Sequence, residues 1–383
     1  MASDIRLLLK EMVDRCGSDL YITADSAPVI RVEGLNQTVE GEPLTPTEVE
    51  ALANSLMTER QRASFEEELE MNLGISSSKL GRFRINVFRQ RGSVGVVVRQ
   101  IKTQIPSLDE LGLPAILKEI VLTKRGLVLV TGATGSGKST TQAAMIDYRN
   151  EHTTGHIITV EDPIEFMHDH KQCLITQREI GFDTHSYENA LKNTLRQAPD
   201  LILIGEVRDC ETMEAAITFA DTGHLCLATL HSNNANQAIE RIMNFFPIER
   251  HREIFLELSL NLRAIVSQRL IPGIDGKRVA ALEILIDTPY VRDLIKKGEV
   301  DTIKEAMERS TQEGGQTFDQ ALFQLYKDGH ISAEQALANA DSANNLRILM
   351  KNLDLRTAER KIIDDTGGLR IQGVSPDQMF RRM

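Results

Sequence analysis

The sequence lacks an apolar run long enough to cross a membrane. A membrane-spanning helix needs about 18 or more consecutive apolar residues, and no stretch of the 383 residues approaches this length. The first residues, MASDIRLLLKEMVDRCGSD, interleave charges with a short apolar stripe. This pattern predicts an amphipathic helix and lacks the continuous apolar region of a secretory signal. We therefore expect a cytoplasmic protein without direct membrane insertion.

Paired cysteines are also missing. The chain has four cysteines, and they are widely scattered: Cys16, Cys173, Cys210 and Cys226. A structural zinc site or a redox centre needs closely spaced cysteines such as a C-x-x-C pair. The spacing excludes such a motif, and we expect these cysteines to be reduced and mostly structural.

The sequence also lacks an excess of positive charge. The formal net charge is −11 at pH 7. Nonspecific nucleic-acid binding depends on Lys and Arg side chains that neutralise phosphates. An acidic chain is a poor match for that electrostatic attraction, so we expect no nucleic-acid partner.

The length and composition predict a multidomain α/β protein. With 41% hydrophobic and 26% charged residues the chain is typical of globular proteins, and 383 residues exceed one ordinary domain. Residues 1–102 alternate short helical and strand patterns, which predicts a small α/β domain with a mainly antiparallel sheet. The following stretch, KTQIPSLDELGLP, carries two prolines and no clear period, and predicts a linker at residues 103–114.

A second domain is predicted at residues 115–350. Short apolar runs alternate with helical segments at residues 127–130, 156–160, 201–204 and 225–230. Continuous apolar strands are typical of a parallel sheet that is covered on both faces, with its ligand site at the carboxyl ends of the strands. From about residue 234 the pattern is mainly helical, interrupted by IPGIDGKR and an apolar run at 279–286, and residues 351–383 are expected to form a flexible extension.

The most specific motif is GATGSGKST, residues 132–140, which follows the expected strand LVLV directly. It matches the G-x-x-x-x-G-K-[ST] phosphate-binding loop, whose glycines let backbone amides approach phosphates at the start of a helix. Lys138 is expected to contact the β- and γ-phosphates of a nucleotide, and Ser139 to bind Mg²⁺. The predicted nucleotide-binding residues of this loop are Gly132, Thr134, Gly135, Ser136, Gly137, Lys138, Ser139 and Thr140.

Two groups of acids follow predicted strands of the same domain. Glu161, Asp162 and Glu165 come after the strand HIITV, and Glu206 comes after LILIG. Glu206 stands where a Walker B acid would bind Mg²⁺, although Asp is more usual there. A single acid at a strand end is equally typical of a solvated loop or a helix cap, but two such groups beside one phosphate loop favour metal and water chemistry.

His224 and His231 flank the predicted strand LCLATL, one near each end. A lone histidine at a strand end is usually a hydrogen-bonded structural residue. Zinc binding is not favoured, because no neighbouring ligands accompany them. From the residues alone, the structural interpretation is preferred.

The order of these motifs resembles the secretion ATPase superfamily. Its Walker A motif, Asp box, glutamate Walker B motif and His box correspond here to GATGSGKST, TVEDPIEF, LILIGEVRD and TGHLCLATLHS. Within that superfamily the chain is similar to the retraction ATPases of type IV pili, the PilT/PilU family, over residues 1–350, including GSDLYIT, GRFRINVF and GGQTFDQAL. The extension past 350, and VRDLIKKGE where PilT-type members carry a stretch like AIRNLIREGK, favour the PilU type.

The resemblance implies a fold and roles for particular residues. It implies a PAS-like N-terminal domain and a RecA-like P-loop ATPase domain with a helical C-terminal part. Glu165 would be the general base or water-orienting acid, supported by Glu161 and Asp162, and Glu206 would bind Mg²⁺. His224 and His231 would sense the γ-phosphate, which replaces the structural interpretation above. Arg84 and Arg99, with Arg82 as a third candidate, would supply positive charge to a nucleotide from the N-terminal domain.

The resemblance also implies cofactors and partners. These are ATP and Mg²⁺, a homo-hexameric ring, a PilT-like retraction ATPase and an inner-membrane platform protein of the pilus. The expected function is an ATP-hydrolysing motor or accessory motor for pilus retraction and twitching motility, at the cytoplasmic side of the inner-membrane base. Rotation of the N-terminal domain about the linker would couple nucleotide binding to movement.

Three alternatives stay open on the sequence. A nucleotide-binding regulator of a PilT-like ring would bind without turnover. A pilus-assembly or type II secretion ATPase commonly has added N-terminal modules and a four-cysteine zinc site, which this sequence lacks. A DNA translocase shares the RecA-like core, but the sequence pI near 5.4 counts against it.

Overall fold

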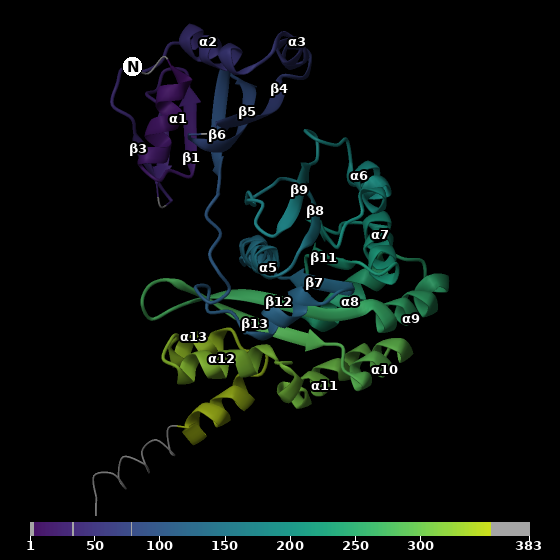
Figure 1. Ribbon diagram of the computed structural model, residues 1–383. Helices are drawn as coiled ribbons and strands as arrows, with labels where there is room; N and C mark the ends of the chain where they lie inside the picture. Colours follow the sequence, from purple (N-terminus) through teal and green to yellow (C-terminus); the bar gives the residue numbers. More distant parts are fainter. Residues whose placement is uncertain (1–3, 33, 78, 354–383) are drawn as a thin grey trace, which may run out of the picture.

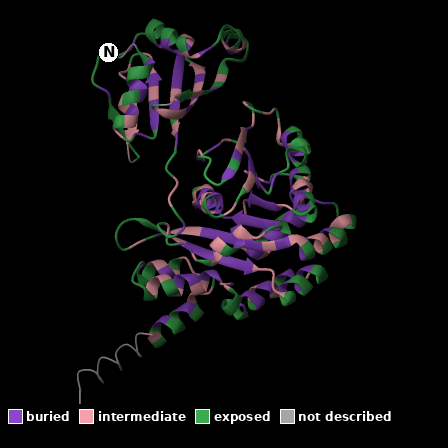
Figure 2. Cartoon of the chain, in the orientation of Figure 1, coloured by how far each residue is buried: buried purple, intermediate pink, exposed green. Residues whose placement is uncertain are grey.

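The computed structural model describes residues 4–32, 34–77 and 79–353, and its strands form two separate sheets. Figure 1 shows the first sheet and its helices at the upper left, joined by an extended segment to the larger second part. The burial colouring in Figure 2 places the buried residues on the strands and on the helix faces turned toward them. The predicted extension at 351–383 lies, apart from residues 351–353, outside the described residues.

The N-terminal sheet is six-stranded and antiparallel, in the order β3-β2-β1-β6-β5-β4. Alternate residues of β5, among them Phe83, Ile85 and Val87, are buried in its core, as expected for a strand with one covered face. Helices α2 and α3 begin at capping boxes on Thr45 and Thr58. The elements are α1 Ile5–Asp14, β1 Asp19–Thr23, β2 Val29–Val32, β3 Leu35–Thr38, α2 Pro46–Leu56, α3 Glu59–Glu68, β4 Glu70–Ser77, β5 Gly81–Gln90 and β6 Ser93–Ile101.

The segment between the sheets is attached to the second part at both ends. The main-chain oxygen of Lys102 accepts a hydrogen bond from the Met167 amide at 3.0 Å. Leu108 and Leu113 are buried in the core of the second part, together with Leu117 of helix α4 (Ile116–Leu122). The stretch predicted as a linker therefore contributes apolar side chains to the second core.

The second sheet has seven strands in the order β13-β12-β7-β11-β10-β8-β9. Strands β12, β7, β11, β10, β8 and β9 are parallel, and β13 pairs antiparallel at one edge. Every residue of β7 is buried, with Leu127 and Leu129 on one face and Val128 on the other. The strands are β7 Gly126–Thr131, β8 Gly155–Glu161, β9 Cys173–Glu179, β10 Leu201–Ile204, β11 Leu225–Leu230, β12 Leu262–Pro272 and β13 Arg278–Ile286.

Helices cover both faces of this sheet, as a parallel sheet requires. The core with Leu127 also contains side chains of α6, α7, α8 and α9, whereas α4 and α5 pack on the opposite face. The helices are α5 Lys138–His152, α6 Tyr187–Thr194, α7 Cys210–Asp221, α8 Ala235–Asn244 and α9 His251–Asn261. The four predicted strand runs correspond to β7, β8, β10 and β11.

The region after residue 234 contains more strand than the sequence pattern indicated. The apolar run at 279–286 lies in β13, and its partner β12 occupies 262–272, where a mainly helical pattern was predicted. That expectation was wrong for β12, because pairing with β7 and β13 determines its conformation. Helices follow: α10 Pro289–Lys297, α11 Ile303–Arg309, α12 Phe318–Lys327, α13 Ala333–Ala338 and a helical stretch at 343–353.

The last helices are held to the second sheet by a small core and one arginine. Phe318 and Leu322 of α12 pack with Ile271 of β12. The Arg269 guanidinium lies 3.8 Å from the Phe318 ring centroid and 2.9 Å from an Asp341 carboxylate oxygen. Within the described residues, no helix combines the length and apolar character that crossing a membrane requires.

Candidate functional site

The glycine-rich loop connects the end of β7 to the start of α5. Gly132 has φ +147°, and a Cβ there would lie 2.5 Å from both the Gln268 main-chain oxygen and the Ser136 hydroxyl. Gly137, with φ +88°, precedes α5 and provides no side-chain cap. The first amides of a helix capped in this way are available to an anion. The backbone therefore takes the form that a phosphate site needs.

Lys138 lies in this loop and points back onto it. Its ammonium group donates hydrogen bonds to the main-chain oxygens of Gly132 at 2.8 Å and Ala133 at 2.9 Å. Burial lowers the pKa of Lys138, while the charges of Glu206 and Glu165 oppose that change. The buried hydroxyl oxygen of Ser136 has no hydrogen-bond partner among the described residues. An incoming phosphate would provide an acceptor for both groups.

A cleft of about 560 Å³ joins the loop to the predicted acids. The residues from the loop that line it are Thr134, Gly135, Gly137, Lys138, Ser139 and Thr140. The lining also includes Glu161, Asp162, Glu165, Glu206 and His231. The carboxyl ends of parallel strands meet at one edge of a sheet, which is why motifs more than 90 residues apart in sequence converge here.

Glu161 is the last residue of β8 and its carboxylate is held by neighbours. The Thr159 hydroxyl donates to Glu161 Oε1 at 2.6 Å, and the Gln177 amide lies 3.4 Å from the same oxygen. Burial raises the pKa of Glu161 to about 7, although these hydrogen bonds act in the opposite direction. A carboxyl group with such a pKa can exchange a proton near neutral pH.

Glu206, just beyond β10, is held on both oxygens. His231 Nε2 lies 3.1 Å from Glu206 Oε1, and Arg208 Nε donates to Glu206 Oε2 at 2.7 Å. Arg208 also reaches Asp162, with 3.4 Å between Nη1 and Oδ2. Burial, and then the charge of Lys138, lower the pKa of His231, which favours a neutral ring beside Glu206.

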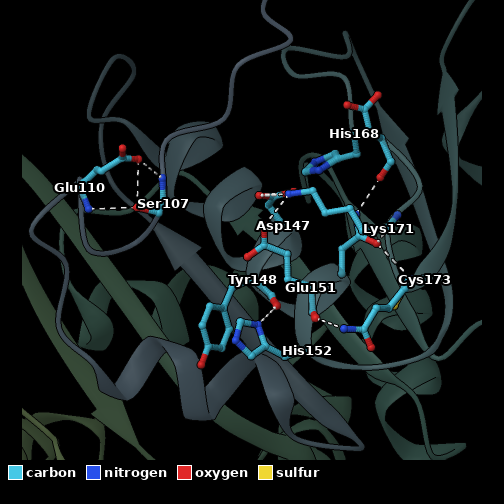
Figure 3. A network of polar contacts seen from close by, with 12 residues as sticks. Ser107, Glu110, Asp147, Tyr148, Glu151, His152, His168, Lys171 and Cys173 are labelled. Atoms are coloured by element: carbon cyan, nitrogen blue, oxygen red, sulfur yellow. Dashed lines mark hydrogen bonds and ion pairs between the residues drawn. The ribbon is translucent and has the colours of Figure 1, made fainter.

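The loop after the Asp box is attached to the distal half of α5. Figure 3 shows Lys171 between the side chains of Asp147 and Glu151, with His168 close by. The Lys171 ammonium lies 2.8 Å from a carboxylate oxygen of each acid. His168 lines the cleft, and burial lowers its pKa to about 4, so its ring is neutral. These contacts hold the Asp-box loop against the helix that carries the phosphate loop.

The cleft suits Mg²⁺ by the chemistry of its oxygen donors. The Ser139 hydroxyl and the Glu206 carboxylate both border it, and Mg²⁺ is usually bound through one or two protein oxygens, phosphates and waters. Among the described residues, no cluster of three or more His, Cys, Asp or Glu side chains could hold a metal ion by itself. Such a partial donor set fits an ion that arrives with a nucleotide.

Arg84 and Arg99 border a second cavity of about 650 Å³, beside the cleft. They lie on β5 and β6, and the lining of this cavity also includes Thr140 and Glu165, which border the cleft as well. Arg99 Nε donates to Asp19 at 2.8 Å, whereas Arg82 and Arg84 face Glu179. The predicted arginines therefore lie near the cleft without lining it.

His224 is at the other edge of the sheet from the phosphate loop. It precedes β11, whose first residue pairs with Gly126 at the start of β7, while His231 follows the end of β11. His224 Nδ1 lies 3.1 Å from the Thr222 hydroxyl. Parallel strands begin at one edge and end at the other, so a single copy of the chain does not bring both histidines to the cleft.

Two contributors to the site were not identified from the sequence. Arg208 stands two residues after Glu206 inside LILIGEVRD, and this proximity was a usable signal. Gln268 accepts a hydrogen bond from the Thr141 hydroxyl at 2.7 Å and lies against Gly137. No local pattern marks Gln268, because its place depends on the pairing of β12 with β7.

Comparisons with known proteins agree with this geometry. Residues 5–349 match the family described as "Type II/IV secretion system protein". The chain is 55% identical over 376 residues to "Type IV pilus ATPase PilU" of Pseudomonas aeruginosa, with 98% of each chain covered. It is 43% identical to "Type IV pilus retractation ATPase PilT" of the same species, covering 89% of this chain and 99% of that one.

A solved structure is also similar. The structure titled "Crystal Structure of the Pilus Retraction Motor PilT and Bound ADP" aligns with a TM-score of 0.83 and 42% identity. The alignment covers 88% of this chain and 97% of that one. The similarity therefore extends over both sheets and the helices that follow.

Proposed function

We propose, from the premise that this chain belongs to the Type II/IV secretion system protein family, that it is an ATP-hydrolysing motor or accessory motor of type IV pilus retraction. The observation that carries this proposal is the convergence of Lys138, Glu165 and Glu206 on one cleft beside the glycine-rich loop. Twitching motility is the expected cellular outcome. The similarity to the structure of PilT with bound ADP supports nucleotide binding by this chain.

In the proposed mechanism, the phosphate loop holds the terminal phosphates of ATP. Lys138 transfers its hydrogen bonds from the Gly132 and Ala133 oxygens to phosphate oxygens. Ser139 and Glu206 would hold Mg²⁺, which supplies positive charge beside the phosphates when it is bound. Arg208 and His231 fix the Glu206 carboxylate from either side.

Glu165 is proposed to orient the attacking water and accept its proton. It borders both the cleft and the second cavity, so it faces the space next to the loop. Glu161 and Asp162 would support it through the local field and through the contact of Asp162 with Arg208. Positioned general bases typically contribute about 10² to 10⁴ in rate.

The remaining proposals concern assembly. We expect a homo-hexamer in which Arg84 and Arg99 bring positive charge to a nucleotide. His224 does not line the cleft of its own copy, so it would sense the γ-phosphate from outside that cleft. A PilT-like ATPase and an inner-membrane platform protein of the pilus are the proposed partners, at the cytoplasmic base of the machine. Movement of the N-terminal sheet about residues 103–114 would couple nucleotide state to the platform.

Hydrolysis by the purified chain, beside a Lys138→Ala variant, tests the proposal. We expect Lys138→Ala to abolish turnover, while Lys10→Ala, on an exposed lysine of α1, leaves it unchanged. Equal rates for wild type and Lys138→Ala would reject the glycine-rich loop as the working site. Nucleotide binding without turnover, alone or with a PilT-like ring, would favour the regulator alternative instead.

A further inference from the structure

Two arginines of the N-terminal sheet face a single buried acid of the second sheet. Arg82 Nη2 lies 3.8 Å from Glu179 Oε2, and Arg84 Nη1 lies 3.9 Å from Glu179 Oε1. Among the ion pairs formed by the described residues, these two are the ones that join the first sheet to the second. The position of the first sheet is therefore linked electrostatically to one carboxylate.

Glu179 is held firmly by its own backbone. It ends β9 and pairs in register with Glu161, the first acid of the Asp box. Its amide donates to Asp183 Oδ2 at 2.9 Å, and its main-chain oxygen accepts from the Asp183 amide at 2.9 Å. The side chain is only 3% exposed. A fixed, desolvated carboxylate attracts cations more strongly than a solvated one.

The contact between the sheets is nevertheless one that can separate. The 3.8 and 3.9 Å distances exceed hydrogen-bond length, so the attraction is between charges without a close bidentate pair. Beside it, the ring of Phe182 lies 3.9 Å from where a Cβ on Gly74 of β4 would stand. A glycine offers this ring no side chain to pack against, so the ring gains little apolar area there.

Arg84 lies between this acid and the nucleotide cleft. It borders the second cavity, whose lining also includes Thr140 of the phosphate loop and Glu165. Both of these residues also line the cleft. A modest movement of the N-terminal sheet would bring the guanidinium toward the loop, and a terminal phosphate would offer it a bidentate, more highly charged partner than Glu179.

We propose that Glu179 is a positioning residue that holds Arg84 and Arg82 away from the cleft, and that it competes for them with the terminal phosphate of ATP. This inference rests on the proposed function, because it requires a nucleotide at the glycine-rich loop. The ion pairs with Glu179 therefore keep the N-terminal sheet in place in the absence of ATP. Binding of a triphosphate breaks these pairs and frees the sheet to move.

Binding of a triphosphate analogue and of ADP to Glu179→Gln tests the competition. We expect Glu179→Gln to bind the Mg²⁺ complex of AMPPNP at least about fivefold more tightly than wild type does. A change of this size is within the range of ordinary coupling between sites. ADP, which lacks the terminal phosphate, should bind within about twofold of wild type. Glu188→Gln, on an exposed acid of α6, removes the same charge and should change neither affinity.

A second variant separates competition from a general loosening. In Glu179→Gln combined with Arg82→Gln and Arg84→Gln, the tightening should disappear, and AMPPNP should bind as it does to the variant that carries the two arginine changes alone. Unchanged AMPPNP affinity in Glu179→Gln, or equal tightening of ADP, would overturn the proposal. Should Glu179→Gln fail to fold, Glu179→Asp keeps the charge but withdraws the carboxylate from both arginines by one methylene group, and its failure to tighten AMPPNP would overturn the proposal equally.

The outcome is distinguishable from failure of the proposed function. If wild type itself binds neither AMPPNP nor ADP, the glycine-rich loop is not a nucleotide site, and both proposals fall. If wild type binds both nucleotides and Glu179→Gln behaves like wild type, only the competition is rejected.

Discussion

At the scale of single residues, the two acids of the cleft differ in how they are held. Glu206 has His231 at one carboxylate oxygen and Arg208 at the other. Glu165 stands where the cleft meets the second cavity, within the wall shared by both. A carboxylate fixed on two sides suits a metal ligand, whereas one beside open space suits contact with water.

This difference predicts distinct effects of replacing each acid by its amide. We expect Glu206→Gln and Glu165→Gln each to lower kcat by about 10² or more, with ATP binding retained. Only Glu206→Gln should raise the Mg²⁺ concentration needed for half-maximal rate, because an amide is a poorer ligand for a hard cation. Initial rates over a Mg²⁺ titration measure both effects. If only Glu165→Gln raised the Mg²⁺ requirement, Glu165 would be the metal ligand and Glu206 the acid that contacts water.

At the scale of elements, the junction between β7 and the phosphate loop allows no side chain at its first glycine. Gly132 has φ +147°, and a Cβ would meet the main-chain oxygen of Gln268 at 2.5 Å. A main-chain atom of a buried strand cannot move aside cheaply. The start of the loop is therefore held in place by β12, which pairs with β7 in the sheet.

We predict that Gly132→Ala destabilises the fold by about 2 kcal/mol or more and weakens nucleotide binding. Gly135→Ala is the matched variant: Gly135 has φ +78°, but no atom lies within 4 Å of a Cβ there. In Gly135→Ala the free energy of unfolding should fall by about 1 kcal/mol, from backbone strain alone. Chemical denaturation compares the two, and an equal loss would show that the contact with Gln268 is unimportant.

Helix α8, which follows His231, begins against a buried acid of β13. Glu283 is 2% exposed, and its Oε1 accepts a hydrogen bond from the Ala235 amide at 2.7 Å. Burial raises the pKa of Glu283 from 4.5 to about 7. In the unfolded chain the group ionises near 4.5, so between pH 4.5 and 7 the folded state binds the extra proton. Its contribution to stability is therefore lost as pH rises through this window.

We predict that Glu283→Gln gains stability relative to wild type as pH rises from 5 to 8, by about 2 to 3 kcal/mol. The amide cannot ionise, so it escapes the cost of a buried charge. Unfolding free energies at several pH values measure this difference. Glu42→Gln, on an exposed residue, should follow wild type at every pH. A constant difference between Glu283→Gln and wild type would contradict the prediction.

At the scale of the whole molecule, the described residues of the first sheet contact those of the second part at separate places. These contacts include the ion pairs to Glu179, the Phe182 ring against Gly74 and the bridge from Lys102 to the segment after the Asp box. Small interfaces between domains permit relative motion. Such contacts are compatible with the movement of the N-terminal sheet that we propose above.

We predict that the purified chain assembles into rings, with a mass six times the 42.8 kDa of one copy. Addition of Mg²⁺ and a nonhydrolysable ATP analogue should favour the assembled form if the ring binds the nucleotide more tightly than the single copy does. Light scattering after size exclusion measures the mass. A monomer at all concentrations would contradict the hexamer. In a separate binding assay, salt-sensitive DNA binding would favour the translocase alternative.

Among the parallel strands of the second sheet, the strongly apolar ones could be predicted from the sequence, and two others could not. All residues of β7, β10 and β11 are buried, so each reads as a short apolar run. Strand β9, CLITQRE, and strand β12, LRAIVSQRLIP, carry polar residues at intervals that do not distinguish strand from helix. Their neighbours β8 and β7 determine their conformation through pairing.

The sequence by itself determined the phosphate loop, the acids after β8 and β10, and the strands that bring them to one edge, because these features are local in the chain. The tertiary structure alone decided that His231 contacts Glu206, that His224 is at the far edge of the sheet, and that Arg82 and Arg84 face Glu179. Charges pair through space, and no spacing along the chain records which distant strands will face each other.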